Sequence, residues 1–307
     1  MTDLSTDFAG IGFQNPVVLA SGTAAYGREL HDIVDLDRLG GLVTKAVSLA
    51  PRPGARAPRV SDFPGGMINA IGLANPGVAV VKETELPWLA ANLSRARVLV
   101  NVVGSTFEDF AEVVSQLDDA AGISAYELNV SCPNVTAGGL EFGADRDVLR
   151  ALIARARGAT RKPLIVKLSP TLSDLAGTAQ LCADAGADAL TLTNTMPGLV
   201  IDTATRRPRI GFGSGGVSGP PLLPIGVLAT WRVTRAVALP VIGLGGVSRG
   251  EHALQYIMAG ATLVGVGTAG MVDPRAPERI VRELERWCAR EGVSSLASLR
   301  GTLEWPV

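Results

Sequence analysis

The segment YELNVSCPN, residues 126–134, gathers a thiol, two asparagine amides and a serine hydroxyl within a short space. Its first part has the pattern of a strand, so Asn129 and Cys132 fall at or just beyond a strand end. Neither a buried strand nor a plain surface loop needs such a cluster. The other cysteines, Cys182 and Cys288, stand on helix-like segments, where we expect packed thiols. At most one cysteine, Cys132, is therefore expected to take part in chemistry.

Polar residues and glycines stand at the ends of most strand-like runs, where strands that only support a fold would not need them. They are Ser21, Lys45, Asn101, Asn129, Lys167, Asn194 with Thr195, and Gly245 with Gly246. A buried ammonium group is costly unless an anion or many acceptors compensate it. The two lysines, Lys45 and Lys167, therefore favour an anionic ligand. The alternative is that they extend to solvent or pair with Glu127.

Two glycine-rich turns, GLGG at residues 243–246 and GVGTAG at residues 265–270, follow the last two strand-like runs. Their backbone N–H groups can approach a phosphate closely, although tight loop geometry alone would also explain the glycines. The second turn matches the G-x-G-x-x-G dinucleotide pattern. That pattern needs a further strand and an acidic residue about 20 residues on, so the match is weak.

Together these residues suggest a phosphate-bearing, anionic and aromatic ligand beside a thiol. Flavin mononucleotide (FMN) fits, because its reduced, anionic ring needs a cation, which would give Lys167 a purpose. The amides of Asn101 and Asn129 would satisfy the edge of the ring. A second class stays open at this point: a phosphosugar aldolase or isomerase that uses a strand lysine as a Schiff base. A yellow purified protein would favour the flavin.

Eight short runs rich in aliphatic residues recur along the chain and would position these side chains. They begin at Val17 (VVLASG), Gly41 (GLVTKAV), Val98 (VLVNVVG), Ala125 (AYELNVS), Pro163 (PLIVKLS), Ala189 (ALTLTNT), Pro240 (PVIGLGG) and Thr262 (TLVGVGT). Most intervals hold a helix-period segment, such as TFEDFAEVVSQLDDA. This alternation predicts a parallel sheet covered by helices, and eight units are the count that closes a (β/α)8 TIM barrel. An open doubly wound sheet is the structural alternative.

Three connections are much longer than usual: residues 48–75, 132–143 and 196–220. Each follows a strand, so all three are expected on the C-terminal face of the barrel, where active sites sit. The opening segment DFAGIGFQNP is expected to form a short hairpin that plugs the other end. No linker or low-complexity segment divides the chain, so residues 1–307 are expected to form a single FMN-binding domain.

The composition excludes several classes of partner. Hydrophobic residues make up 47% and charged residues 19%, which supports a large core rather than extended disorder. A formal net charge of -1 gives no footprint for nucleic acid or an anionic membrane. No apolar run reaches the ~20 residues that span a bilayer and no signal-peptide pattern begins the chain, so we expect a cytoplasmic protein. The three separated cysteines form no pair for a metal or an iron–sulfur cluster.

An ordered set of motifs closely resembles the dihydroorotate dehydrogenases. The motifs are Lys45, NAIGLANPG from Asn69, ELNVSCPN from Glu127, VKLSP from Val166, TNT from Thr193, GGVSGPPLLPI from Gly215 and GLGG from Gly243, and the likeness runs from about Phe8 to the final helix. The chain most resembles class 1, since class 2 generally carries a serine base and an N-terminal membrane-associating extension. NAIGLANPG is more similar to subclass B, which passes electrons to NAD through a partner, than to subclass A, the fumarate-reducing homodimer.

The resemblance implies a (β/α)8 barrel that carries FMN and oxidises dihydroorotate to orotate in pyrimidine (UMP) synthesis. It implies that Cys132 is the base that removes the proton from C5 of dihydroorotate while hydride leaves C6 for the flavin N5. A thiol near pKa 8.5 can serve as a base where its surroundings favour the thiolate. The glycine-flanked segment 132–143 would be the lid that closes over the substrate.

Carried over position by position, the resemblance also implies two sets of binding residues. The flavin would contact Ser21, Lys45, Ala46, Asn101, Asn129, Lys167, Thr193, Gly219, Gly245, Gly246, Gly267 and Thr268. The orotate carboxylate and ring amides would be held by Lys45, Asn69, Ala70, Ile71, Gly72, Leu73, Asn129, Asn194 and Thr195. Ala46 departs from the glycine or serine expected in many relatives, and its methyl group would shift the flavin edge slightly.

Reduced FMN must pass its electrons on, yet the sequence offers no second nucleotide fold and no cysteine cluster for a metal relay. The resemblance to subclass B implies a separate subunit that carries FAD and a 2Fe-2S cluster and delivers electrons to NAD. That subunit would bind a homodimer of this chain, which gives a heterotetramer. The alternative is subclass A behaviour, in which fumarate enters the same pocket after orotate leaves.

Overall fold

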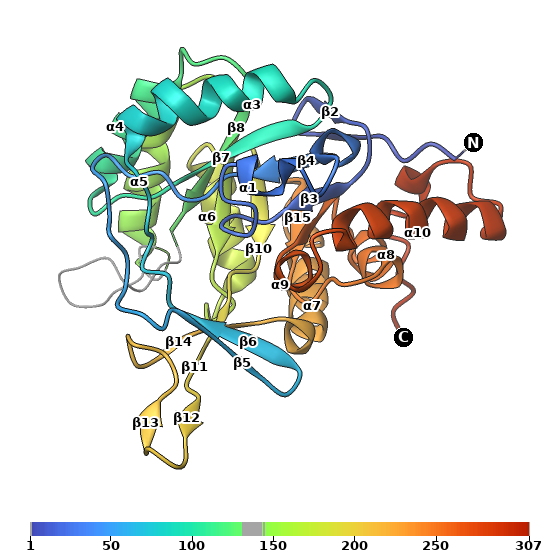
Figure 1. Ribbon diagram of the computed structural model, residues 1–307. Coiled ribbons are helices and arrows are strands. Elements are labelled where there is room, and N and C mark those ends of the chain that lie inside the picture. Colours follow the sequence, from blue (N-terminus) through green and yellow to red (C-terminus); the bar gives the residue numbers. More distant parts are fainter. Residues whose placement is uncertain (1, 131–142, 144, 307) are drawn as a thin grey trace.

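The computed structural model describes residues 2–130, 143 and 145–306, and at its centre eight parallel strands close a barrel (Figure 1). The strands are β3 (Val17–Leu19), β4 (Gly41–Val43), β7 (Arg97–Val102), β8 (Ile123–Asn129), β9 (Leu164–Leu168), β10 (Ala189–Leu192), β15 (Val241–Leu244) and β16 (Leu263–Val266). Each pairs with the next, and β16 pairs with β3 to complete the ring. The predicted (β/α)8 barrel is therefore confirmed, and the open-sheet alternative is wrong.

Helices alternate with the strands and cover the barrel. The longer ones are α3 (Leu86–Asn92), α4 (Phe107–Leu117), α5 (Arg146–Ala159), α6 (Leu175–Asp184), α7 (Leu223–Thr234), α8 (Gly250–Met258) and α10 (Ala276–Glu291). Shorter turns are α1 (Arg28–His31), α2 (Val78–Val80), a π-helical turn (Val81–Glu85), α9 (Thr268–Val272) and the 3-10 turns Leu36–Arg38, Pro220–Leu222 and Leu296–Leu299.

Helix α4 shows why such a segment becomes a helix. Thr106 and Asp109 form a reciprocal capping box at its start, which satisfies backbone N–H groups that have no partner within the helix. Its buried side chains recur three or four residues apart and make one apolar face: Phe110, Val113, Val114 and Leu117. The helix predicted from the 3.6-residue period is confirmed here.

A hairpin closes the N-terminal end of the barrel, as the opening segment predicts. Strands β1 (Thr6–Phe8) and β2 (Ile11–Phe13) are antiparallel, and Ala9 and Gly10 between them both have positive φ, as a tight type I′ turn requires. Phe8 and Phe13 are fully buried and meet edge to face, with ring centroids 6.0 Å apart. They pack in one cluster with an apolar residue from every barrel strand: Val18, Val43, Leu99, Ala125, Ile165, Ala189, Ile242 and Leu263.

Two of the three predicted long connections meet above the other end of the barrel. The connection after β4 forms β5 (Val60–Phe63) and β6 (Gly66–Asn69), and the one after β10 forms β11 (Met196–Gly198) and β14 (Gly215–Ser218). These pair as a four-stranded sheet in the order β11-β14-β6-β5. A separate hairpin, β12 (Ile201–Asp202) with β13 (Arg207–Pro208), projects beyond it (Figure 1). The third predicted connection lies, apart from Gly143, outside the described residues.

Candidate active site

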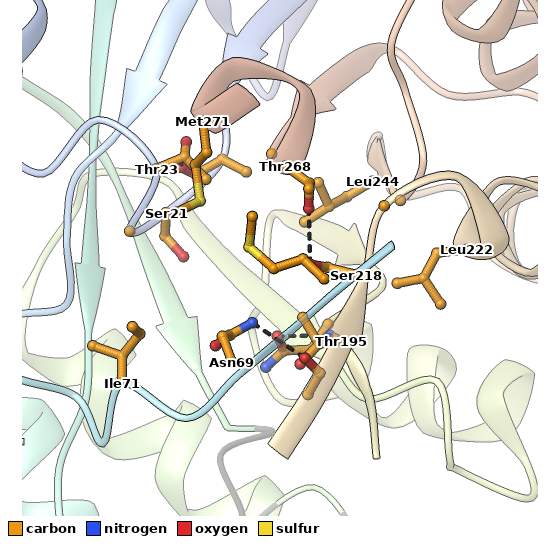
Figure 2. A pocket seen from close by; sticks show the side chains of 18 of the residues that line it. Ser21, Thr23, Asn69, Ile71, Thr195, Ser218, Leu222, Leu244, Thr268 and Met271 are labelled. Atoms are coloured by element: carbon orange, nitrogen blue, oxygen red, sulfur yellow. Dashed lines mark hydrogen bonds between the residues drawn. The ribbon is translucent and has the colours of Figure 1, made fainter. Parts of the chain in front are cut away.

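A cavity of about 850 Å³ opens at the carboxyl ends of the barrel strands, walled on one side by the four-stranded sheet (Figure 2). Every described residue that was expected to bind the flavin or orotate lines it: Ser21, Lys45, Ala46, Asn69, Ala70, Ile71, Gly72, Leu73, Asn101, Asn129, Lys167, Thr193, Asn194, Thr195, Gly219, Gly245, Gly246, Gly267 and Thr268. Cys132 lies outside the described residues. The structure thus brings the predicted residues together, while the role of each stays a prediction.

The two lysines give the cavity a positive charge. Lys167 is only 5% exposed, and its Nζ donates to the Ser21 hydroxyl at 3.2 Å. Lys45 is partly buried on the same lining. Among the residues that the structure describes, no ion pair involves either lysine. The other charged side chains of the lining, Asp273 and Arg279, pair with each other. An anionic ligand would compensate the two ammonium groups.

Glu127 makes no ion pair with a lysine among the described residues, so that alternative from the sequence is wrong. Glu127 is 1% exposed, and its carboxyl group accepts hydrogen bonds from Asn101 Nδ2 at 2.7 Å and from the Thr191 hydroxyl at 2.6 Å. The other end of the Asn101 amide, Oδ1, is buried and has no hydrogen-bond partner within the described part of the chain. Because Asn101 lines the cavity, a ligand that donates an N–H there would satisfy it.

The first of the two glycine turns, residues 243–246, has a backbone that only glycine suits. Gly245 and Gly246 both have positive φ, and a Cβ on Gly246 would stand 2.6 Å from the backbone nitrogen of Leu223. The Tyr256 hydroxyl holds the turn by donating to the Gly245 carbonyl at 2.8 Å, and burial raises the pKa of Tyr256, so the hydroxyl keeps its proton. A bulkier residue at 246 cannot be accommodated without moving this loop.

Amides cluster on the substrate side of the cavity. Asn69, at the end of β6, donates to the carbonyl of Gly216 at 3.2 Å, which joins the two inserted hairpins. The side chain of Asn194 approaches Asn129 Oδ1 at 3.5 Å and accepts from the backbone N–H of Thr195 at 2.9 Å. These contacts place amide donors and acceptors beside Lys45 on one lining, which suits a planar ligand with a carboxylate and ring amides.

Ala46, the one departure from the expected pattern, is 7% exposed and lines the cavity. Its carbonyl accepts a hydrogen bond from the Tyr26 hydroxyl at 3.2 Å. Burial, followed by the charges of Glu85 and Glu29, raises the pKa of Tyr26, so this donor stays protonated near neutral pH. The backbone of Ala46 is thus held from outside the cavity, whatever its methyl group contacts.

Several lining residues were not predicted, among them Ser218, Thr23 and Met271. The Ser218 hydroxyl accepts from that of Thr268, which was predicted, at 2.8 Å across the end of the cavity, as Figure 2 shows. The sequence does carry a signal for Ser218: a hydroxyl between glycines in GGVSG, directly before Gly219, which was expected to contact the flavin. Met271 carries no comparable signal, because an exposed methionine on a short helix has no polar pattern around it.

The described residues offer neither a membrane-spanning helix nor a metal site. No helix among them is long and apolar enough to cross a membrane. No group of three or more histidine, cysteine, aspartate or glutamate side chains in the same residues could hold a metal ion.

Comparison with known proteins gives a consistent result. A family model described as dihydroorotate dehydrogenase matches residues 3–287. The chain is 46% identical over 302 residues to the dihydroorotate dehydrogenase B (NAD(+)), catalytic subunit, of Pelobacter propionicus, a match that covers 98% of this chain and 99% of the relative. The protein of the same name from Geobacter sp. (strain M21) is 46% identical over 302 residues, with 98% of each chain covered. A relative from Solibacter usitatus, provisionally named dihydroorotate dehydrogenase A (fumarate), is 48% identical over 302 residues, with 98% of this chain and 99% of the relative covered.

Proposed function

The chain belongs to the dihydroorotate dehydrogenase family, and from that premise we propose that it is the catalytic subunit of an NAD-linked enzyme that oxidises dihydroorotate to orotate for pyrimidine synthesis. The observation that carries the proposal is one cavity that combines two lysines without ion pairs to the described residues, a set of amides and two glycine turns. In addition, 98% of this chain aligns at 46% identity with the catalytic subunit from Pelobacter propionicus. Family membership decides against the aldolase or isomerase alternative.

We propose FMN as the cofactor of residues 1–307, taken as a single domain. Two observations support the fit: the cationic Lys167 in the cavity and the buried Asn101 Oδ1 that lacks a donor within the described residues. The phosphate would lie at the turns that contain Gly246 and Gly267, and the ring beside Lys167 and Asn101. When bound, FMN supplies a ring that accepts hydride from the substrate.

The chain itself would hold the substrate and move one proton. Lys45 would bind the carboxylate, while residues 69–73 with Asn129, Asn194 and Thr195 would bind the ring amides. Cys132 would remove the proton from C5 of dihydroorotate, and residues 132–143 would exclude water. These roles are carried over from the family motif, and Cys132 lies outside the described residues.

Replacement of Cys132 by serine tests the proposed base. We expect Cys132→Ser to retain FMN but to slow flavin reduction by dihydroorotate roughly 10²–10⁴-fold near neutral pH, because a hydroxyl is a far weaker base than a thiolate. The rate should partly recover as the pH rises. Stopped-flow absorbance of the flavin measures it.

Cys182 provides the matched control. It is fully buried, and burial raises the pKa of its thiol to about 12, so it is no base near neutral pH. Cys182→Ala should therefore reduce its flavin at the parental rate. A Cys132→Ser variant that also kept the parental rate would refute the assignment of the base.

We further propose that a separate subunit with FAD and a 2Fe-2S cluster takes the electrons to NAD, on a homodimer of this chain. The support is that the relatives from Pelobacter and Geobacter are named as catalytic subunits. The fumarate-linked alternative is favoured by one observation, the 48% identity to the Solibacter protein.

One assay of the purified chain separates these two acceptors. Given dihydroorotate, the chain alone should reduce an artificial dye or oxygen but show negligible reduction of NAD or fumarate. Brisk fumarate turnover would establish the fumarate-linked alternative. Turnover of NAD without any partner would refute the proposed relay subunit.

A further inference from the structure

We propose that Glu127 and Thr191 are positioning residues that fix the side-chain amide of Asn101 with its oxygen toward the cofactor. The site would then accept a hydrogen bond from a ring N–H of the flavin and would disfavour a ring carbonyl at the same point. This inference rests on the proposed function, because it assigns a role toward bound FMN.

The three side chains form a buried chain of hydrogen bonds across three strands of the barrel. Asn101 on β7, Glu127 on β8 and Thr191 on β10 are 0%, 1% and 1% exposed. Thr191 donates to one carboxyl oxygen of Glu127 at 2.6 Å, and Asn101 Nδ2 donates to the other at 2.7 Å. The backbone N–H of Asn101 is also fixed, because it donates to the Thr44 hydroxyl at 3.2 Å. Little freedom remains for the Asn101 side chain.

The carboxyl group decides which way the amide faces. An amide has donors at its nitrogen and acceptors only at its oxygen, so a turned amide would set Asn101 Oδ1 against an oxygen of Glu127. Two facing acceptors lose the hydrogen bond and add repulsion. Thr191 strengthens this choice, because its hydroxyl occupies the other carboxyl oxygen and stops Glu127 from rotating away.

The amide oxygen is left for the ligand. Asn101 lines the cavity and Glu127 does not; because Asn101 Nδ2 already donates to the Glu127 carboxyl group, Oδ1 is the amide atom that remains for a ligand. Within the described residues, only this atom and the Thr230 hydroxyl are buried side-chain polar atoms without a partner. A buried acceptor without a donor is costly, and a ligand N–H removes that cost on binding. The isoalloxazine ring of FMN has such an N–H at N3.

An exchange of donor and acceptor between the two partners tests this arrangement. In Asn101→Asp two carboxyl groups face each other, and in Glu127→Gln the new amide can let Asn101 turn over. The double variant combines both changes. There the amide nitrogen introduced at position 127 donates to the carboxylate introduced at position 101, the amide oxygen accepts from Thr191, and an oxygen again faces the ring. We expect each single variant to weaken FMN binding about tenfold or more, and the double variant to return within about threefold of the parent.

The measurement is the dissociation constant of FMN, obtained from the fluorescence of FMN released when the purified holoprotein is diluted. Thr191→Val, which keeps the shape but removes the hydroxyl, should weaken FMN a few-fold. Thr230→Val is the matched control: Thr230 is equally buried on α7 and lies outside the cavity, so FMN binding should not change. The position of the flavin absorbance band should shift in Glu127→Gln and return in the double variant.

Two results would overturn the inference. Losses that simply multiply in the double variant, near a hundredfold, would show that the two residues act independently. An unchanged Thr191→Val would show that the hydroxyl does not hold the carboxyl group, even if the charged variants failed to fold. A parent chain that bound no FMN would instead refute the proposed function, and this inference with it.

Discussion

The two ends of one barrel are built from the same eight strands and differ in almost every physical respect. At the N-terminal end each strand contributes an apolar side chain, and Phe8 and Phe13 of the hairpin fill the remaining space. At the C-terminal end the strands finish in lysines, amides and glycines around a cavity of about 850 Å³. The alternation of inward-facing and outward-facing side chains along a strand is the same at both ends. The difference therefore comes from the residue types that the sequence places near each end of the strands.

The N-terminal end of the barrel mainly supports stability, and the C-terminal end mainly supports ligand binding. The closed end gains free energy from the burial of apolar surface by the side chains that fill it. The open end retains costs that packing does not remove: the buried ammonium group of Lys167 and the oxygen of Asn101, which has no partner among the described residues. A ligand would remove these costs, so a change at each end should affect different quantities.

Truncation of a buried aromatic side chain in the hairpin should have the largest effect on stability. We expect Phe8→Ala to lower the free energy of unfolding by about 3–5 kcal/mol, because a fully buried ring is lost and leaves a cavity. The dissociation constant of FMN should not change. Urea unfolding of the apoprotein, followed by circular dichroism, measures the first quantity.

Ile33→Ala is the control for this truncation, since Ile33 is 48% exposed and should cost less than about 0.5 kcal/mol. The comparison between the two ends would fail if Phe8→Ala weakened FMN binding as strongly as Asn101→Asp does.

Removal of a cation at the open end should do the opposite. We expect Lys167→Met to speed the release of FMN by roughly tenfold and to lower the flavin potential, because the ammonium group stabilises the reduced, anionic ring more than the oxidised ring. The unfolding free energy of the apoprotein should stay the same or rise, since the variant removes a buried charge that has no ion pair among the described residues. The fluorescence of released FMN, spectroelectrochemistry and urea unfolding measure the three quantities.

Substitutions at two other lysines test whether this effect is specific to the cavity. Lys82→Met removes a solvent-exposed lysine that pairs with Asp119, and all three quantities should stay at the parental values. Lys45→Ala should in addition raise the dissociation constant of orotate. If neither Lys45→Ala nor Lys167→Met changed the flavin potential or the affinity for orotate, the proposal that the two lysines face a ligand would be wrong.

The barrel itself could be predicted because its signals are local. Each strand is a short aliphatic run next to a polar or glycine end, and each helix carries its own period and caps, as α4 does. The hairpin was equally predictable, since the glycine in DFAGIGF supplies the positive φ of a tight turn. None of these inferences needs a contact between distant parts of the chain.

The four-stranded sheet could not be predicted, because it pairs segments far apart in sequence. β6 joins β14, with Asn69 opposite Gly216, across nearly half the chain. β14 reads GGVS, which lacks the alternation and β-branched residues that mark a strand. The sequence identified these segments as insertions at the active-site end and could say no more.

The site shows the same limit at the level of single atoms. Residue types at strand ends indicated that Lys167, Asn101 and Glu127 would belong to one end of the barrel. The partners of Glu127 could not be predicted: it bonds Asn101 and Thr191, and not the lysine that the sequence left open as an alternative. Thr191 had given no signal, because a threonine in ALTLT is also an ordinary strand residue. Hydrogen-bond partners depend on ångström-scale geometry that strand order alone does not determine.

We expect the smallest effect from substitution of His252, on α8, which follows the glycine turn of residues 243–246. His252 is 9% exposed; its Nε2 accepts from Arg249 Nε at 3.0 Å, and its Nδ1 lies 3.2 Å from the Ser248 hydroxyl oxygen. Burial first, and then the charge of Arg249, lower the pKa of His252, although the Gly246 carbonyl, Glu251 and Glu283 oppose the shift.

Because the folded pKa lies below the unfolded value, about 6.5, the unfolded chain binds more protons between the two values. Stability is therefore fully present above pH 6.5 and falls as the pH drops through the folded pKa. His252→Gln should flatten this slope, and FMN release below pH 6.5 should become less dependent on pH, because the imidazole no longer charges beside Arg249. Urea unfolding and FMN release from about pH 5 to 8 measure both; equal slopes in the parent and His252→Gln would mean that the imidazole supports the turn only by its shape.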